Sequence, residues 1–87
     1  GSGSVIVPIP LLEILERSRQ DLDSEQIKNI IQSDLPFLLK SLNEESEEVK
    51  KTAVRAIKNL TAKGKELRSE FIANGTVQII LSFLKAK

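Results

Sequence analysis

An internal repeat limits the architectures that are open to this chain. The apolar segment LPFLLKSL at residues 35–42 has a second copy, VQIILSFL, at residues 77–84, which begins 42 residues later. The matched apolar positions are Leu35, Leu38, Leu39 and Leu42 in the first copy and Val77, Ile80, Leu81 and Leu84 in the second. An apolar pair before each copy, Ile30-Ile31 and Phe71-Ile72, repeats with an offset of 41, so the second connection has one residue more. A helical unit of about 40 residues that recurs predicts a solenoid of stacked helices.

Residues 45–64 are expected to form the central helix of this stack. Their apolar side chains have helical spacing and fall on one side, at Val49, Ala53, Ala56, Ile57 and Leu60. Ser46 is a good N-cap, and the carboxylates of Glu47 and Glu48 in the first turn favour the positive end of the helix dipole. Gly64 suits the left-handed position that closes a helix. The small side chains of Ala53 and Ala56 predict close approach by a neighbouring helix.

The segments on either side are expected to be shorter helices. Residues 5–9 predict an extended lead-in or an edge strand, and a helix follows from Pro10. Asp23 or Ser24 can cap a short helix that ends near Ser33-Asp34. A further helix over residues 65–75 is ended by Asn74-Gly75.

The last segment, residues 76–87, is predicted as a helix rather than the second strand of a hairpin, because Ile79, Ile80 and Leu81 are all apolar and so do not alternate with polar residues as a half-buried strand would. IPLLEIL at residues 9–15 is a poorer third copy of the repeated segment.

These segments resemble the armadillo repeat family over residues 24–84. The resemblance rests on AIKNL followed by a glycine, on IANG before an apolar helix, and on the 42-residue spacing. EQIKNIIQSD resembles the short first helix of such a repeat, LPFLLKSLN the second, and EESEEVKKTAVRAIKNLTAKG the long third. The resemblance implies an all-α, right-handed α-solenoid fragment, with the two-helix HEAT repeat as the neighbouring alternative.

The domain assignment that follows has one helical unit. Residues 1–4 (GSGS) are interpreted as a scar left by cloning, and residues 5–87 as a single armadillo-like helical domain. Within it we expect a partial repeat at 9–22, a full repeat at 23–64 and a partial repeat at 65–87. The sequence is compatible with a fragment of a longer repeat protein, with a small natural domain and with an engineered chain.

Composition argues against several classes of function. The chain of 87 residues has 13 basic and 12 acidic residues, so its net charge of +1 predicts no general attraction to nucleic acid or to a membrane. It has no cysteine and no histidine, so we expect no catalytic residues, no metal site and no cofactor. The acidic run at residues 44–48 is interpreted as a solvated first turn. The chain is expected to be intracellular, either cytoplasmic or nuclear, and not an enzyme.

The candidate binding residues lie on the face of the central helix opposite its apolar stripe. On a helical wheel Glu48, Thr52, Arg55, Asn59 and Ala62 fall within a sector of about 80°, with Lys51 and Lys58 on its flank. In the armadillo family the third helices line a concave groove, and the resemblance implies that Asn59 occupies the position of the groove asparagine, whose amide can pair with the backbone of an extended peptide.

Arg55 departs from one known version of that groove. Nuclear-import receptors of this family use Trp at this position, so the departure argues against binding of a basic nuclear-localisation peptide. Arg and Lys along the face would favour an acidic segment instead. Two plainer interpretations stay open: Lys51, Arg55 and Lys58 can form a solvated helix face, and Asn59 can be a local structural hydrogen-bonder.

The sequence therefore predicts a non-enzymatic protein-interaction module, an adaptor or scaffold, that binds an extended and possibly acidic protein segment. The alternative is self-association into a homo-oligomer through the terminal helices. That alternative rests on apolar side chains of the last segment, such as Ile79 and Phe83, which a further repeat would normally cover.

Overall fold

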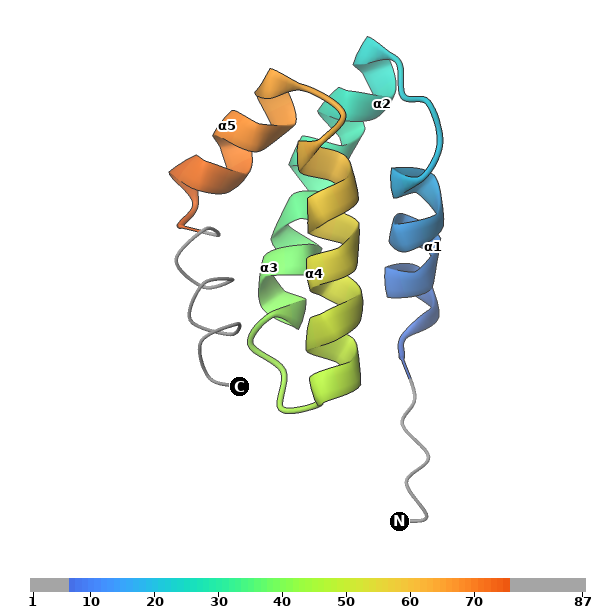
Figure 1. Ribbon diagram of the computed structural model, residues 1–87, viewed down its shortest axis with the longest axis vertical. Coiled ribbons are helices and arrows are strands. Elements are labelled where there is room, and N and C mark those ends of the chain that lie inside the picture. The colour runs from blue at the N-terminus through green and yellow to red at the C-terminus, as the bar shows by residue number, and fades with distance from the viewer. Residues whose placement is uncertain (1–6, 76–87) are drawn as a thin grey trace.

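The computed structural model describes residues 7–75. In this range the chain forms helices and no strand: α1 (Ile9–Ser18), α2 (Ser24–Asn29), the π-helical η1 (Ile30–Asp34), α3 (Leu35–Ser41), α4 (Glu47–Thr61) and α5 (Lys65–Ala73) (Figure 1). The predicted all-α class is thereby confirmed for the described residues. Val7 and Pro8 precede α1 without regular structure. Residues 5 and 6 of the predicted lead-in and the predicted helix at residues 76–87 lie outside the described residues.

Helix α4 is the centre of the molecule, as expected. It packs against α1, α3 and α5, and Figure 1 shows it with α1 on one side and α3 and α5 on the other. The whole predicted apolar stripe is buried, namely Val49, Ala53, Ala56, Ile57 and Leu60. The Ser46 hydroxyl accepts a hydrogen bond from the Val49 N–H at 3.3 Å, so the predicted N-cap is also confirmed.

The end of α4 differs from the prediction. Gly64 has a φ of 178°, which is extended backbone, and it serves as the N-cap of α5 rather than as a left-handed closure of α4. The prediction for Gly64 was wrong because α4 closes earlier, at Ala62, whose N–H donates to the Lys58 carbonyl at 3.2 Å. The left-handed glycine is Gly75, with a φ of 77°, and α5 does end at Asn74-Gly75 as predicted.

The start of the full repeat follows the sequence closely. Asp23 caps α2 in a capping box: its Oδ1 accepts from the Gln26 N–H at 2.8 Å, and the Gln26 Oε1 accepts from the Asp23 N–H at 2.9 Å. These two reciprocal bonds satisfy backbone donors that the first helical turn would otherwise leave free. They fix the point at which the first helix of the repeat begins.

The expected break near Ser33-Asp34 does not occur. The chain continues from α2 through η1 into α3 without a loop, and the Leu35 N–H donates to the carbonyl of Ile30, five residues back. Pro36 gives the physical reason, because it lacks the N–H of a regular α-helix and its ring crowds the carbonyl four residues earlier. The wider π turn accommodates that ring and keeps the helix continuous.

Helix α1 takes a different place from the one that its sequence suggested. IPLLEIL was expected to copy the second helix of the repeat, but α1 packs along α4, and the two helices run in the same direction (Figure 1). It leads into α2 just as α4 leads into α5. In the stack, α1 therefore occupies the position of a third helix in the preceding unit. Its buried residues Leu11, Ile14 and Leu15 join the same core as the α4 stripe.

Candidate protein-binding face

The structure brings most of the predicted binding residues together on one exposed face of α4. This exposed α4 face consists of Glu48, Lys51, Arg55, Lys58 and Ala62. Among residues 7–75, no carboxylate forms an ion pair with Lys51, Arg55 or Lys58, whereas neighbouring Lys50 lies 3.8 Å from the Glu47 carboxylate. The three cations on this face therefore have their charge available to a partner.

Thr52 does not belong to this face, and its prediction as a contact residue was wrong. Its relative exposure is 7%, and its hydroxyl donates to the Glu48 carbonyl at 2.7 Å. The helical wheel placed Thr52 at the edge of the polar sector. A wheel of one helix does not predict that α1 covers this edge. Because α1 packs along α4, that edge is buried.

Asn59 lies at the boundary between the exposed face and the contact with α1. Its side chain is half-buried, and Nδ2 donates to the Ser18 hydroxyl of α1 at 3.1 Å. The Ser18 hydroxyl in turn donates to the Leu15 carbonyl at 2.6 Å, and Ser18 is fully buried. Asn59 is thus a structural hydrogen-bonder that joins two helices, and the bond spans 41 residues rather than being local.

A hollow opens between the C-terminal ends of α1 and α4, and Asn59 lines it. Its volume is about 360 Å³, and its lining residues are Ser18, Arg19, Asn59, Ala62 and Lys63. The helical spacing of α4 predicted Asn59 and Ala62 as contact residues, but it did not predict Ser18, Arg19 or Lys63. A usable signal existed, because Ser18 precedes Asn59 by 41 residues, which is the offset already found between the apolar pairs of the repeat.

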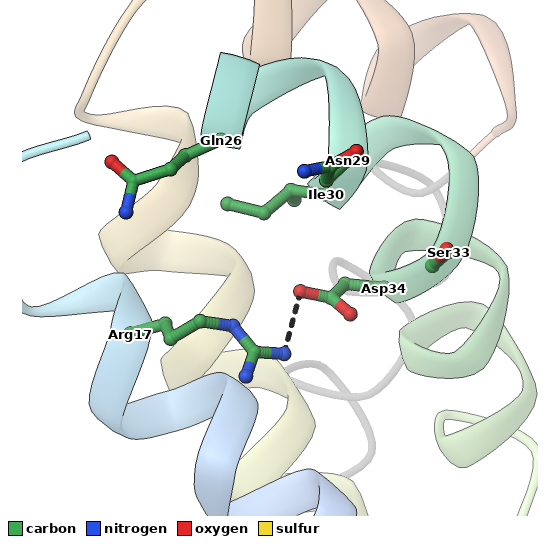
Figure 2. Close-up of a pocket in the computed structure, with 6 residues that line it drawn as sticks. All are labelled: Arg17, Gln26, Asn29, Ile30, Ser33 and Asp34. Atoms are coloured by element: carbon green, nitrogen blue, oxygen red, sulfur yellow. Dashed lines mark hydrogen bonds and ion pairs between the residues drawn. The ribbon is translucent and has the colours of Figure 1, made fainter. Parts of the chain in front are cut away.

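A second hollow, of about 260 Å³, lies between α1 and the α2–η1 segment (Figure 2). It is lined by Arg17, Gln26, Asn29, Ile30, Ser33 and Asp34. Figure 2 shows Arg17 and Asp34 facing one another, with Arg17 Nη2 2.9 Å from Asp34 Oδ2. This ion pair neutralises the two charged groups within the hollow, so we interpret it as a second link between α1 and the full repeat rather than as a site for a charged ligand.

The bond between Asn59 and Ser18 can be tested by a double-mutant cycle. We expect Asn59→Ala and Ser18→Ala to be coupled by about 1 kcal/mol in the free energy of unfolding, because each change alone leaves a partly buried polar group without its partner. Urea denaturation of the wild type, both single variants and the double variant measures this coupling. Additive losses would show that the bond does not tie α1 to α4.

The described residues support neither a metal site nor a membrane-spanning helix. No group of three or more His, Cys, Asp or Glu side chains in residues 7–75 is arranged to hold a metal ion. Within the same range, no helix combines the length and the apolar character that crossing a membrane requires.

Comparison with known proteins finds a similarity over part of the chain. Residues 23–62 match the family model described as the armadillo/beta-catenin-like repeat. The comparisons with curated proteins and with solved structures each gave no match. The match covers α2, η1, α3 and α4, which form the three-part unit of a short, a medium and a long helix. Armadillo repeats generally mediate protein–protein interaction, and modules of this family are typically non-enzymatic. Residues 23–62 are therefore similar to an armadillo repeat, and they lie within a stack of helices that has no strand among residues 7–75.

Proposed function

We propose that this chain binds an extended, acidic protein segment on the exposed α4 face. The observation that carries the proposal is the set of three cations, Lys51, Arg55 and Lys58, which have no ion-pair partner among residues 7–75. Their charge-assisted hydrogen bonds to carboxylates are stronger than neutral ones, and the arginine can bind a carboxylate with two parallel bonds. An acidic partner segment supplies that complement.

Two further residues support this face as the contact surface. Ala62 is exposed at the end of α4 and has no side chain beyond Cβ, so a partner backbone can approach the helix closely there. Asn59 uses Nδ2 in its bond to Ser18, but an amide has a second N–H and a carbonyl oxygen. It can therefore keep its link to α1 and still pair with a peptide group of the bound segment.

The proposal is tested with two capped ten-residue probes, poly-glutamate and poly-lysine, titrated into the chain by calorimetry. We expect poly-glutamate to bind and poly-lysine not to bind. The triple variant Lys51→Ala/Arg55→Ala/Lys58→Ala should weaken poly-glutamate binding by about tenfold or more, because it removes three charge-assisted contacts. Binding to the wild type should also weaken as salt is raised, since exposed charges are screened.

The matched control is Lys28→Ala/Lys40→Ala/Lys65→Ala, which removes the same net charge from exposed positions on α2, α3 and α5. It should bind poly-glutamate within about twofold of the wild type, apart from the general effect of net charge. Equal weakening by both triple variants would show that the attraction is non-specific, and equal binding of the two probes would contradict the proposal.

A further inference from the structure

The exposed large hydrophobic side chains of residues 7–75 all lie on two helices, α1 and α5. Ile9 and Leu12 of α1 are 68% and 46% exposed, and Ile72 of α5 is 54% exposed. One such residue alone is normal on a protein surface and needs no explanation. Here each of them lies on a helix face that also carries a group of charges, so the two faces can be compared as surfaces.

The exposed face of α1 is apolar near the N-terminus of the helix and acidic toward its C-terminus. Ile9, Leu12, Glu13 and Glu16 are all exposed, and they fall within a sector of about 100° on a helical wheel. The buried residues of α1 lie on the opposite side and belong to the core. These four exposed residues are called the outer α1 face below.

The exposed face of α5 has the reverse order and the opposite charge. Lys65 and Arg68 lie at its N-terminal end and Ile72 at its C-terminal end, all three exposed and within a sector of about 60°. The buried residues of α5, Leu67 and Phe71, lie on the other side. Among residues 7–75, neither Lys65 nor Arg68 forms an ion pair. Lys65, Arg68 and Ile72 are called the outer α5 face.

The two faces are complementary when the helices lie antiparallel. Leu12 precedes Glu16 by four residues, which is about 6 Å along a helix. Arg68 precedes Ile72 by the same four residues, so the same distance separates the charged and apolar groups of α5. Contact between Leu12 and Ile72 then places Glu16 against Arg68. In a parallel arrangement Ile72 would face a carboxylate, so the order of the groups selects one orientation.

The two faces cannot meet within one chain. Helices α1 and α5 lie on opposite sides of α4, and the buried residues of both join the core, so the outer faces are directed away from it (Figure 1). The contact therefore joins two copies, and it is heterologous because two different surfaces meet. Each added copy leaves one outer α1 face and one outer α5 face open, so association continues unless a ring closes.

We propose that a second copy of this chain docks its outer α5 face on the outer α1 face. Charge complementarity identifies this occupant, and the apolar ends of the two faces cover each other. The Glu16 carboxylate lies 3.7 Å from the Arg19 guanidinium, but both side chains are more than half exposed, so this ion pair is weak and does not prevent the contact.

This interface is separate from the surfaces considered above. It uses neither the exposed α4 face nor residues 76–87, so it is independent of the proposed function and of an association through the last segment. A contact between two short helices is small, and small interfaces belong to weak complexes. The association is therefore expected to depend strongly on protein concentration.

Sedimentation velocity of the full chain at several concentrations tests the interface. We expect the weight-average mass of the wild type to rise with concentration and to fall when salt is raised. Two charge-reversal variants, Glu13→Lys/Glu16→Lys and Lys65→Glu/Arg68→Glu, should each weaken self-association by about tenfold or more, because like charges then face each other. An equimolar mixture of the two variants should associate as the wild type does, since the reversed face of one complements the reversed face of the other.

The matched control is Lys28→Glu/Lys40→Glu, which changes the net charge as the α5 variant does, at exposed positions on α2 and α3. It should associate like the wild type, whereas Ile72→Gln should weaken association by removing the apolar contact. A wild type that stays monomeric at every concentration would overturn the proposal. So would a mixture that fails to associate, association that persists in both charge-reversal variants, or equal weakening by the control. Circular-dichroism melting checks that each variant is folded, and all the changed residues are exposed.

Discussion

Leu60→Ala should lower the free energy of unfolding by about 3 kcal/mol, within the range of about 2–5 kcal/mol that such core truncations cause. The side chain of Leu60 is 0% exposed and forms the last turn of the α4 stripe. Its removal loses the transfer free energy of the buried carbons and leaves a cavity that fixed helices cannot fill. Since domains of this size have about 5–15 kcal/mol of stability, the loss is a large share of the total.

Urea denaturation followed by circular dichroism measures this effect, and Leu12→Ala is the matched control. Leu12 is 46% exposed on α1, so the same chemical change there should cost less than about 1 kcal/mol. A Leu60→Ala variant whose urea midpoint equals that of Leu12→Ala would show that the C-terminal turn of α4 is not part of the core.

Ala56→Leu should also destabilise the chain, by about 2 kcal/mol, for the opposite reason. Ala56 is 0% exposed, one helical turn before Asn59, the residue that bonds to α1. A leucine there adds three carbons at a fully buried position, so the helices packed on α4 must move or the side chain must adopt a strained rotamer. We therefore expect the Asn59–Ser18 bond to weaken as well.

The control for this change is Ala62→Leu, which adds the same carbons at the exposed C-cap of the same helix. Thermal denaturation should show a lower midpoint for Ala56→Leu and a midpoint close to the wild type for Ala62→Leu. The NMR signal of the Asn59 side-chain amide reports the position of α1 in each variant. Unchanged stability of Ala56→Leu would mean that the neighbouring helices are not closely packed on α4 at this level.

The parts of the fold that depend on nearby residues could be predicted from the sequence. The N-cap Ser46, the buried stripe of α4 and the cap at Asp23 all follow from spacings of three or four residues. Helix caps and amphipathic stripes are local, so a single sequence contains their signals. The spacing of the repeat also predicted the order of the helices, and the structure confirms that order for the described residues.

The predictions that were wrong concern residues whose burial or conformation depends on a segment distant in the sequence or on the exact end of a helix. The burial of Thr52 and the bond of Asn59 both depend on α1, which packs on α4 from about one repeat away. The apolar spacing of IPLLEIL suits a second or a third helix equally well, so spacing alone could not place α1. Gly64 and Gly75 both follow a helix, and only the end of the hydrogen-bond ladder determines which of them adopts a positive φ.

The junction between the first and second helices shows what the repeat offset could and could not predict. The extra residue in the second connection indicated that the two junctions differ. The first junction is the continuous η1 segment that bridges α2 and α3, and after α5 the backbone turns at the left-handed Gly75. The difference in length was visible in the sequence, but the π turn before Pro36 was not.

The continuous path through η1 determines where this chain tolerates extra residues. Between Ser24 and Thr61 the helical backbone is interrupted only at residues 42–46, where Asn43, Glu44 and Glu45 are exposed. Insertions are accepted at exposed loop tips and rejected where they disturb a helical hydrogen-bond ladder. A reporter tag or a second binding domain can therefore be inserted in this loop. The loop lies at the N-terminal end of α4, whereas the hollow between α1 and α4 lies at the C-terminal end. An insertion in η1 would instead separate the first helix of the repeat from the second.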